Sequence, residues 1–159
     1  YTHGAIWAVM AFARMGNAER AWQLWSMLSP VNHTLNADSV GIYKAEPYVM
    51  SADVYSVAPH TGRAGWSWYT GSAGWAWRLL TEELLGIKRS GTDFSVHARL
   101  PDEWSSFSMA YQYGESHYQI SVSRGDAEYC VTLDGVLLPD DRIPLKDDGQ
   151  NHTVEIIQN

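Results

Sequence analysis

The chain has 159 residues, 45% hydrophobic and 18% charged, which is the balance of an ordinary folded globular protein. Its net charge of -7 argues against a nucleic-acid partner, which would call for a basic surface. No apolar run approaches the roughly 18 residues of a membrane span, so no membrane segment is expected. The single cysteine excludes an internal disulfide, and the six histidines lack HExxH spacing, so neither a metal nor a cofactor is expected.

The region 1–90 is predicted to be helical. Apolar residues recur at helical spacing over 5–15 and again over 18–28, with Gly16-Asn17 between them, so a helical hairpin that stops at Pro30 is expected. A polar stretch over 31–38 precedes a short helical piece near 38–44, and an irregular region then runs to about Tyr69. A last helix is predicted over 71–85, with Thr70 as its N-cap and Gly86 as its stop.

The region 91–159 changes to an alternating pattern that is typical of strands. Apolar residues alternate near 94–98, 107–113, 118–122, 129–133 and 154–156. Gly114-Glu115 and Asp134-Gly135 are candidate hairpin turns, the second of type I′. Cys130 is expected to be a small buried residue of one strand. The sequence therefore predicts an α+β fold, with helices first and an antiparallel β-sandwich second.

The segment 46–77 gathers four Trp and three Tyr around a Gly-punctuated turn. Aromatic rings cover the C–H faces of sugars, so a saccharide site is predicted, with Tyr48, Trp66 and Trp68 as substrate-binding residues. The alternative is that these rings only build a core. The Gly-rich run 62–74 lacks the Lys of a nucleotide P-loop, and no GxSxG motif marks a serine nucleophile.

The start of the 71–85 helix is a candidate anion site. Free N–H groups and the positive dipole end at Thr70 and Gly71 favour phosphate or sulfate, and His3 and Arg63 offer side-chain donors. Two alternatives stay open at this point. Thr70 caps its helix and nothing more, and Arg63 pairs with Glu46 or Asp53.

Several motifs in order resemble the C-terminal end of glycoside hydrolase family 94, over about residues 1–125. They are YTHG at 1–4, KAEPYV at 44–49, GR at 62–63, WYTGSAGW at 68–75 and LPDEW at 100–104. The residues of these motifs are most similar to the branch that holds cyclic β-1,2-glucan synthases. The resemblance implies the last helices of an (α/α)6 barrel followed by the sandwich. It also implies that His3, Thr70 and Gly71 bind phosphate, and Arg63 is a further phosphate-binding candidate.

The chemistry implied by the resemblance is inverting phosphorolysis, in which inorganic phosphate is a co-substrate and an aspartic acid protonates the leaving oxygen. The family places that acid upstream of Tyr1, and Asp38, Glu46 and Asp53 do not match it. The chain also begins without Met inside an expected helix, which suggests a piece of a longer protein. Alone it is expected to be inactive, to need the rest of the barrel as its partner, and to self-associate through exposed apolar faces.

The expected substrate is β-linked glucan, with β-1,2 linkages favoured. Ser51-Ala52 stands where disaccharide phosphorylases of the family tend to carry a glutamine, which puts a disaccharide substrate in doubt. A stand-alone oligoglucan, cellobiose or chitobiose phosphorylase is the second interpretation, and a non-catalytic glycan-binding module is the third. A cytoplasmic location is expected, and an inner-membrane anchor elsewhere in the parent protein is left open.

Overall fold

The computed structural model describes residues 1–126 and 128–159 and divides into two compact units. Tyr1–Leu84 is helical and Leu85–Asn159 is built from strands, so the α+β prediction is confirmed. The last helical segment ends at Leu84 and the first strand starts at Ile87, so the change from helix to strand falls between them. No helix in the described part of the chain has the length and apolar character to cross a membrane.

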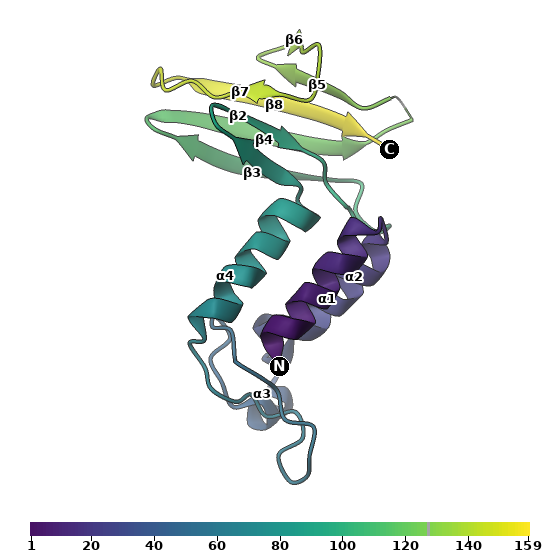
Figure 1. The fold of residues 1–159 in the computed structure, drawn as a ribbon, viewed down its shortest axis with the longest axis vertical. Helices are drawn as coiled ribbons and strands as arrows, with labels where there is room; N and C mark the ends of the chain where they lie inside the picture. The colour runs from purple at the N-terminus through teal and green to yellow at the C-terminus, as the bar shows by residue number, and fades with distance from the viewer. Residues whose placement is uncertain (127) are drawn as a thin grey trace. The chain divides into compact units, whose positions relative to one another are not determined.

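The helical unit begins with the predicted hairpin (Figure 1). Its elements are α1 (Thr2–Arg14), α2 (Ala18–Leu28), the 3-10 turn η1 (Pro30–His33), α3 (Ala37–Tyr43), α4 (Thr70–Arg78) and the π-helical continuation η2 (Leu79–Leu84). The Asn17 side chain caps α2 by accepting the Arg20 N–H at 3.1 Å. Asn36 caps α3 through a reciprocal pair of bonds with Ser39, which explains why so short a helix forms.

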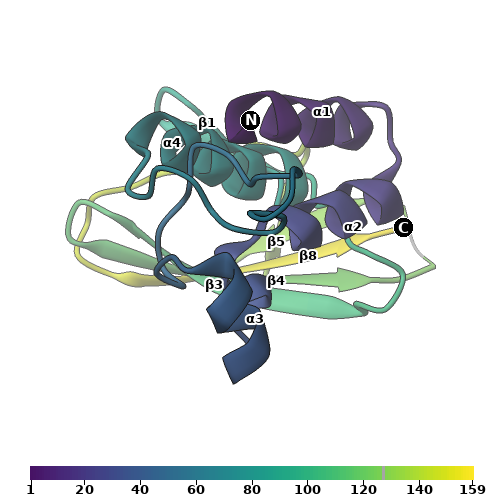
Figure 2. The ribbon, with the colours of Figure 1, turned by 90° about the horizontal axis from the view of Figure 1, so that it is seen from below.

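Helix α1 is the centre of this unit, because α2 packs on one side of it and α4 with η2 on another (Figures 1 and 2). The four apolar positions that predicted the helix, Ile6, Val9, Met10 and Ala13, are all buried. They meet Ala21 of α2, Ala76 of α4, and Leu79 and Leu84 of η2. Arg14 adds a charged tie by donating to the Glu83 carboxylate at 2.8 and 3.1 Å.

Two details of the helical prediction were wrong. The stretch predicted as simply polar contains η1, which Pro30 starts because its fixed φ suits a first helical position. Thr70 is the first residue of α4 and not its N-cap; Tyr69 holds the cap position, and no side chain caps this helix. Gly86 does follow the last helical turn, with a φ of 76° that favours glycine.

The strand unit contains two sheets. Their strands are β1 (Ile87–Ser90), β2 (Asp93–Val96), β3 (Ser106–Tyr113), β4 (Ser116–Arg124), β5 (Cys130–Leu133), β6 (Val136–Leu137), β7 (Ile143–Pro144) and β8 (Asn151–Gln158). The small sheet has the order β1-β2-β7 and the large one β3-β4-β8-β5-β6. Apolar side chains from β2 and β7 share one core with those from β4, β5 and β8, as a sandwich requires.

The large sheet is mixed, which corrects the antiparallel prediction. β8 lies between β4 and β5 and pairs in parallel with β4, with His117 opposite Asn151 and Ile120 opposite Val154. An alternating pattern reports which face of a strand is buried but not which strand is its neighbour, so this pairing was not predictable from it. Cys130 lies in β5 as expected, but it is only half-buried.

A buried histidine holds the far end of this sheet together. His152 of β8 places Nδ1 at 2.8 Å from Asp134 and Nε2 at 3.2 Å from Asp148, while its ring stacks on Tyr118. Asp134 opens the predicted type I′ turn, with φ of 51° there and 77° at Gly135. The hydrogen bond to Asp134 raises the pKa of His152, and the bond from His152 lowers the pKa of Asp134.

This arrangement predicts that the stability of the chain falls as the pH rises above neutrality. A histidine whose pKa is raised by folding stabilises fully below its unfolded pKa, which is about 6.5, and loses that contribution as pH rises through the folded value. Urea unfolding from pH 5.5 to 9 should therefore show a declining free energy of unfolding, and His152→Gln should flatten the decline. The same substitution at exposed His117 of β4 should leave the slope in place. An unchanged slope in His152→Gln would contradict the assignment.

Candidate functional site

The ends of two parallel helices form the candidate site. His3, Trp7 and Arg14 of α1 lie beside Gly71, Trp75 and Glu83, in that order along α4 and η2. The two helices therefore run in the same direction, and their N-termini lie together. The approach at that end is close, because a Cβ on Gly71 would lie 2.7 Å from Nε2 of His3. Only glycine leaves the imidazole its present position.

Both helix N-termini have backbone N–H groups to offer. Among the residues that the structure describes, no side chain caps α1 or α4. Within the described residues, the N–H groups of Thr70, Gly71 and Ser72 have no hydrogen-bond acceptor. The Ser72 hydroxyl in the same turn is fully buried and also has no partner there. Uncapped N–H groups at the positive end of a helix favour an anion.

The His3 ring is oriented by two tyrosines. Its Nδ1 lies 2.8 Å from the Tyr1 hydroxyl, and that hydroxyl lies 3.4 Å from the hydroxyl of Tyr69. The ring also lies edge-on to Tyr69, with 5.3 Å between centroids. The hydrogen bond with Tyr69 raises the pKa of Tyr1, so the phenol stays protonated at neutral pH. With Nδ1 engaged by a hydroxyl, Nε2 is the nitrogen that faces Gly71.

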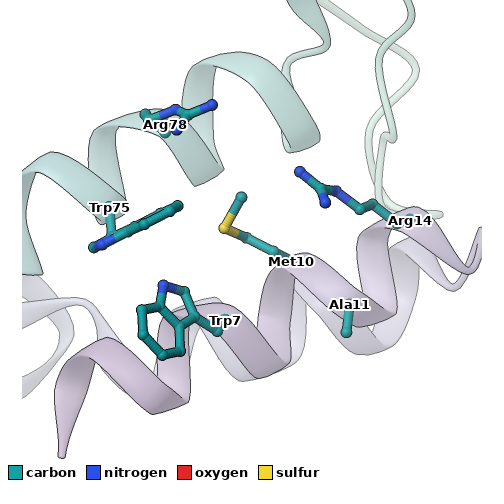
Figure 3. Close-up of a pocket in the computed structure, with 6 residues that line it drawn as sticks. All are labelled: Trp7, Met10, Ala11, Arg14, Trp75 and Arg78. Carbon is teal, nitrogen blue, oxygen red and sulfur yellow. The ribbon is translucent and has the colours of Figure 1, made fainter.

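An aromatic groove continues along the same two helices (Figure 3). Trp7 and Trp75 meet edge to face, with 5.6 Å between centroids, and Trp7 lies next to the His3 ring at 6.2 Å. The Arg78 guanidinium lies over the Trp75 ring at 5.3 Å and pairs with Glu82. The hollow between them measures about 390 Å3 and is also lined by Met10 and Arg14. Flat rings beside fixed donors are a suitable wall for a sugar.

The long connection before α4 is held against the helix ends by backbone bonds. Ala52 accepts from the Thr2 N–H at 2.8 Å and donates to Trp66 at 2.8 Å, and Met50 accepts from Tyr69 at 3.0 Å. On this connection Tyr48 and Trp68 form an edge-to-face pair with 6.1 Å between centroids. Both rings are mostly exposed, as is Trp66, so the reading of these three rings as a core is wrong.

Glu46 supports the exposed ring of Trp68. Its carboxylate accepts a hydrogen bond from the indole N–H at 3.3 Å. A backbone hydrogen bond within the residue, together with bonds from Ser67 and Trp68, lowers the pKa of Glu46. The carboxylate is therefore ionised at neutral pH and serves as an acceptor that orients the indole.

The predicted site residues fall into three groups. His3, Thr70 and Gly71 lie together at the helix ends, and Tyr48 and Trp68 lie together on the connection. Arg63 belongs to neither group, because no contact within the described residues joins it to His3, and it forms no ion pair there with Glu46 or Asp53. The hydroxyls of Tyr1 and Tyr69 and the Trp7–Trp75 pair were missed. The i,i+4 spacing of His3 and Trp7 was the available signal for Trp7.

Comparison with known proteins assigns this architecture to one family. Residues 1–86 match the model of the glycosyl hydrolase 94 superfamily catalytic domain, and they include every residue of the helix-end site. The chain is similar to the cyclic β-(1,2)-glucan synthase NdvB of Rhizobium meliloti, with 44% identity over 124 residues. That match covers 78% of this chain and 4% of the synthase.

Two phosphorylases are also similar. The chain is 28% identical to solabiose phosphorylase of Paenibacillus borealis, with 98% of the chain and 21% of the enzyme covered. It is 29% identical to N,N'-diacetylchitobiose phosphorylase of Vibrio proteolyticus, with 99% of the chain and 20% of the enzyme covered. The chain thus spans about a fifth or less of the length of these relatives. Since the family model matches more than half of its residues, the chain belongs to glycosyl hydrolase family 94.

Proposed function

We propose that this chain supplies the phosphate-binding part of a catalytic site that phosphorolyses β-linked glucan to a sugar 1-phosphate. The observation that carries the proposal is the meeting of two uncapped helix N-termini, with Nε2 of His3 directed at Gly71. Phosphorylases among the relatives support the reaction class. The helices would be the last of an (α/α)6 barrel that the rest of the parent protein completes.

The physics of this end favours a phosphate ion. Two parallel helix dipoles lie side by side with their positive ends together, which is unfavourable without a negative charge nearby. Phosphate accepts from several N–H groups at once, and the amides of Thr70, Gly71 and Ser72 are uncommitted among the described residues. When the Tyr1 hydroxyl donates to Nδ1 of His3, the neutral imidazole carries its hydrogen on Nε2 and becomes a further donor.

In inverting phosphorolysis the bound phosphate attacks the anomeric carbon while a carboxylic acid protonates the leaving oxygen on the other face. That acid must be protonated at working pH. Glu46 is unsuited to the role because its pKa is lowered and its carboxylate is engaged by Trp68. We therefore place the general acid in another part of the parent protein. The 159-residue chain alone should then be inactive.

For the substrate, we favour a β-1,2-glucan in a protein of the cyclic glucan synthase type. The identity to the synthase, 44%, is well above the 28% and 29% found with the two phosphorylases. Exposed Tyr48, Trp66 and Trp68 would stack on glucose rings that extend away from the phosphate. A stand-alone disaccharide phosphorylase is the second candidate. It is favoured by the alignment with solabiose phosphorylase, which covers 98% of the chain.

The first prediction concerns the reaction itself. The full-length protein that contains this segment, given phosphate and linear β-1,2-gluco-oligosaccharides, should release glucose 1-phosphate, and the 159-residue chain alone should release none. Cellobiose and chitobiose in parallel reactions test the second candidate. Product from a disaccharide alone would move the assignment to that candidate. Activity of the isolated chain would refute the assignment of the acid to another segment.

The second prediction concerns the space that Gly71 leaves for His3. In Gly71→Ala the new methyl displaces the imidazole, so the affinity for phosphate should fall about tenfold, or roughly 1.4 kcal/mol. The affinity is measured by titration with phosphate, monitored through the NMR amide signals of residues 70–72. The matched control is Gly74→Ala in the same helix, where a Cβ would meet nothing within 4 Å. Gly74→Ala should gain up to about 1 kcal/mol of stability from better helix propensity, whereas in Gly71→Ala the contact with His3 offsets that gain. Equal phosphate affinity in the two variants would argue against the His3 site.

A further inference from the structure

A second concave site lies at the other end of the connecting segment, at the C-terminal end of α3. Lys44 follows this helix, and His60, Thr61 and Arg63 come from the loop that folds over it. Together with Gly41, Ile42 and Pro59 they line a hollow of about 180 Å3. Within the part of the chain that the structure describes, the hollow shares no lining residue with the helix-end site of His3, Thr70 and Gly71.

The loop that carries these side chains is held firmly. The Ala64 N–H donates to the Tyr43 carbonyl at 2.9 Å, Gly62 N–H donates to Tyr55 at 2.8 Å, and Arg63 N–H donates to His60 at 3.0 Å. Gly62 also sits so close to α3 that an added Cβ would lie 2.7 Å from a methyl of Ile42. The basic side chains therefore project from backbone that is fixed on both sides of the hollow.

The charge of the hollow is unbalanced. Three of its lining residues are basic, and none in the described lining is acidic, although the chain as a whole carries a net charge of -7. Arg14, Arg78, Arg124 and Arg142 all have carboxylate partners. Lys44 and Arg63, like exposed Arg20, have no ion pair within the described residues. Two permanent cations that line one small space raise the positive potential there, which favours an anion.

We propose that this hollow, defined by Lys44, His60, Thr61 and Arg63, is a second anion site that binds a phosphate group. Arg63 presents a planar fork that suits two phosphate oxygens, Lys44 adds a point charge, and the Thr61 hydroxyl donates. The volume is below the roughly 300 Å3 at which drug-sized ligands are usually enclosed, so it fits an anionic group and not an oligosaccharide chain. The group comes from free phosphate or from a phosphorylated sugar.

The test follows amide signals of the chain in a 15N-labelled sample during titration with inorganic phosphate, glucose 1-phosphate and neutral β-1,2-gluco-oligosaccharide. Signals of Lys44, Thr61 and Arg63 should shift with the first two ligands and not with the third. Shifts with both indicate that the phosphate group alone is recognised, and shifts only with glucose 1-phosphate identify a phosphorylated sugar. Either result supports the site. Shifts only with the neutral sugar, or with none of the three, overturn it.

Variants separate this site from the helix-end site. Arg63→Ala and Lys44→Ala should each weaken phosphate binding at the hollow at least fivefold, while the signals of residues 70–72 respond as before. In Gly71→Ala the hollow should keep its affinity. Arg20→Ala, which removes a cation from the exposed surface of α2, is the matched control and should change neither. If Gly71→Ala abolishes the response at the hollow, the two sites are one and the proposal is wrong.

Discussion

The parallel alignment of α1 with α4 is the constraint on which the helical unit depends. Apolar burial holds the middle of the pair, where Ile6, Val9 and Met10 meet Ala76 and Leu79. At the C-terminal end, the guanidinium of Arg14 neutralises the buried carboxylate of Glu83. Such a pair is costly to break because one charge would remain in an apolar setting. At the opposite end the positive ends of the two helix dipoles lie together, and the amides of residues 70–72 have no acceptor within the described residues.

The absence of a cap on α4 has a chemical meaning. A Ser, Thr or Asp at position 69 would accept a bond from the first-turn amides and stabilise the helix by about 1 kcal/mol. Tyr69 gives up that stabilisation, and its hydroxyl is directed instead to the pair that orients His3. The helix end is thus less stable than it could be and more available to a ligand. This is a common relation between a binding site and the fold that carries it.

The connection from Lys44 to Tyr69 carries two kinds of side chain to separate places. Its Ala52 carbonyl accepts from the Thr2 N–H of α1, and its Ala64 N–H donates to the Tyr43 carbonyl at the end of α3. Exposed rings lie on one part of it and unpaired basic side chains on another. A single irregular segment therefore offers surfaces for a sugar and for an anion, while Met50 of the same segment packs against the helical core.

Much of the fold was predictable because its signals are local. The spacing of Ile6, Val9, Met10 and Ala13 identified the buried face of α1, and Asp134-Gly135 identified a turn with two positive φ angles. The parallel neighbour of β8 was not predictable, since it depends on which of several similar strands comes alongside. The place of Arg63, beside Lys44 and His60, was not predictable for a related reason, because the charge of a side chain indicates what it can bind and not where its loop lies.

The close approach of His3 to Gly71 also depends on how the residues of α1 align with those of α4. A change in the length of α1 alters this alignment more than a side-chain substitution does. A residue inserted into or deleted from α1 between Gly4 and Arg14 turns the two ends of the helix relative to each other by about 100°. Either His3 would then leave Gly71, or Arg14 would leave Glu83. The number of residues between His3 and Arg14 must therefore stay the same, whereas the exposed side chains of the helix can change.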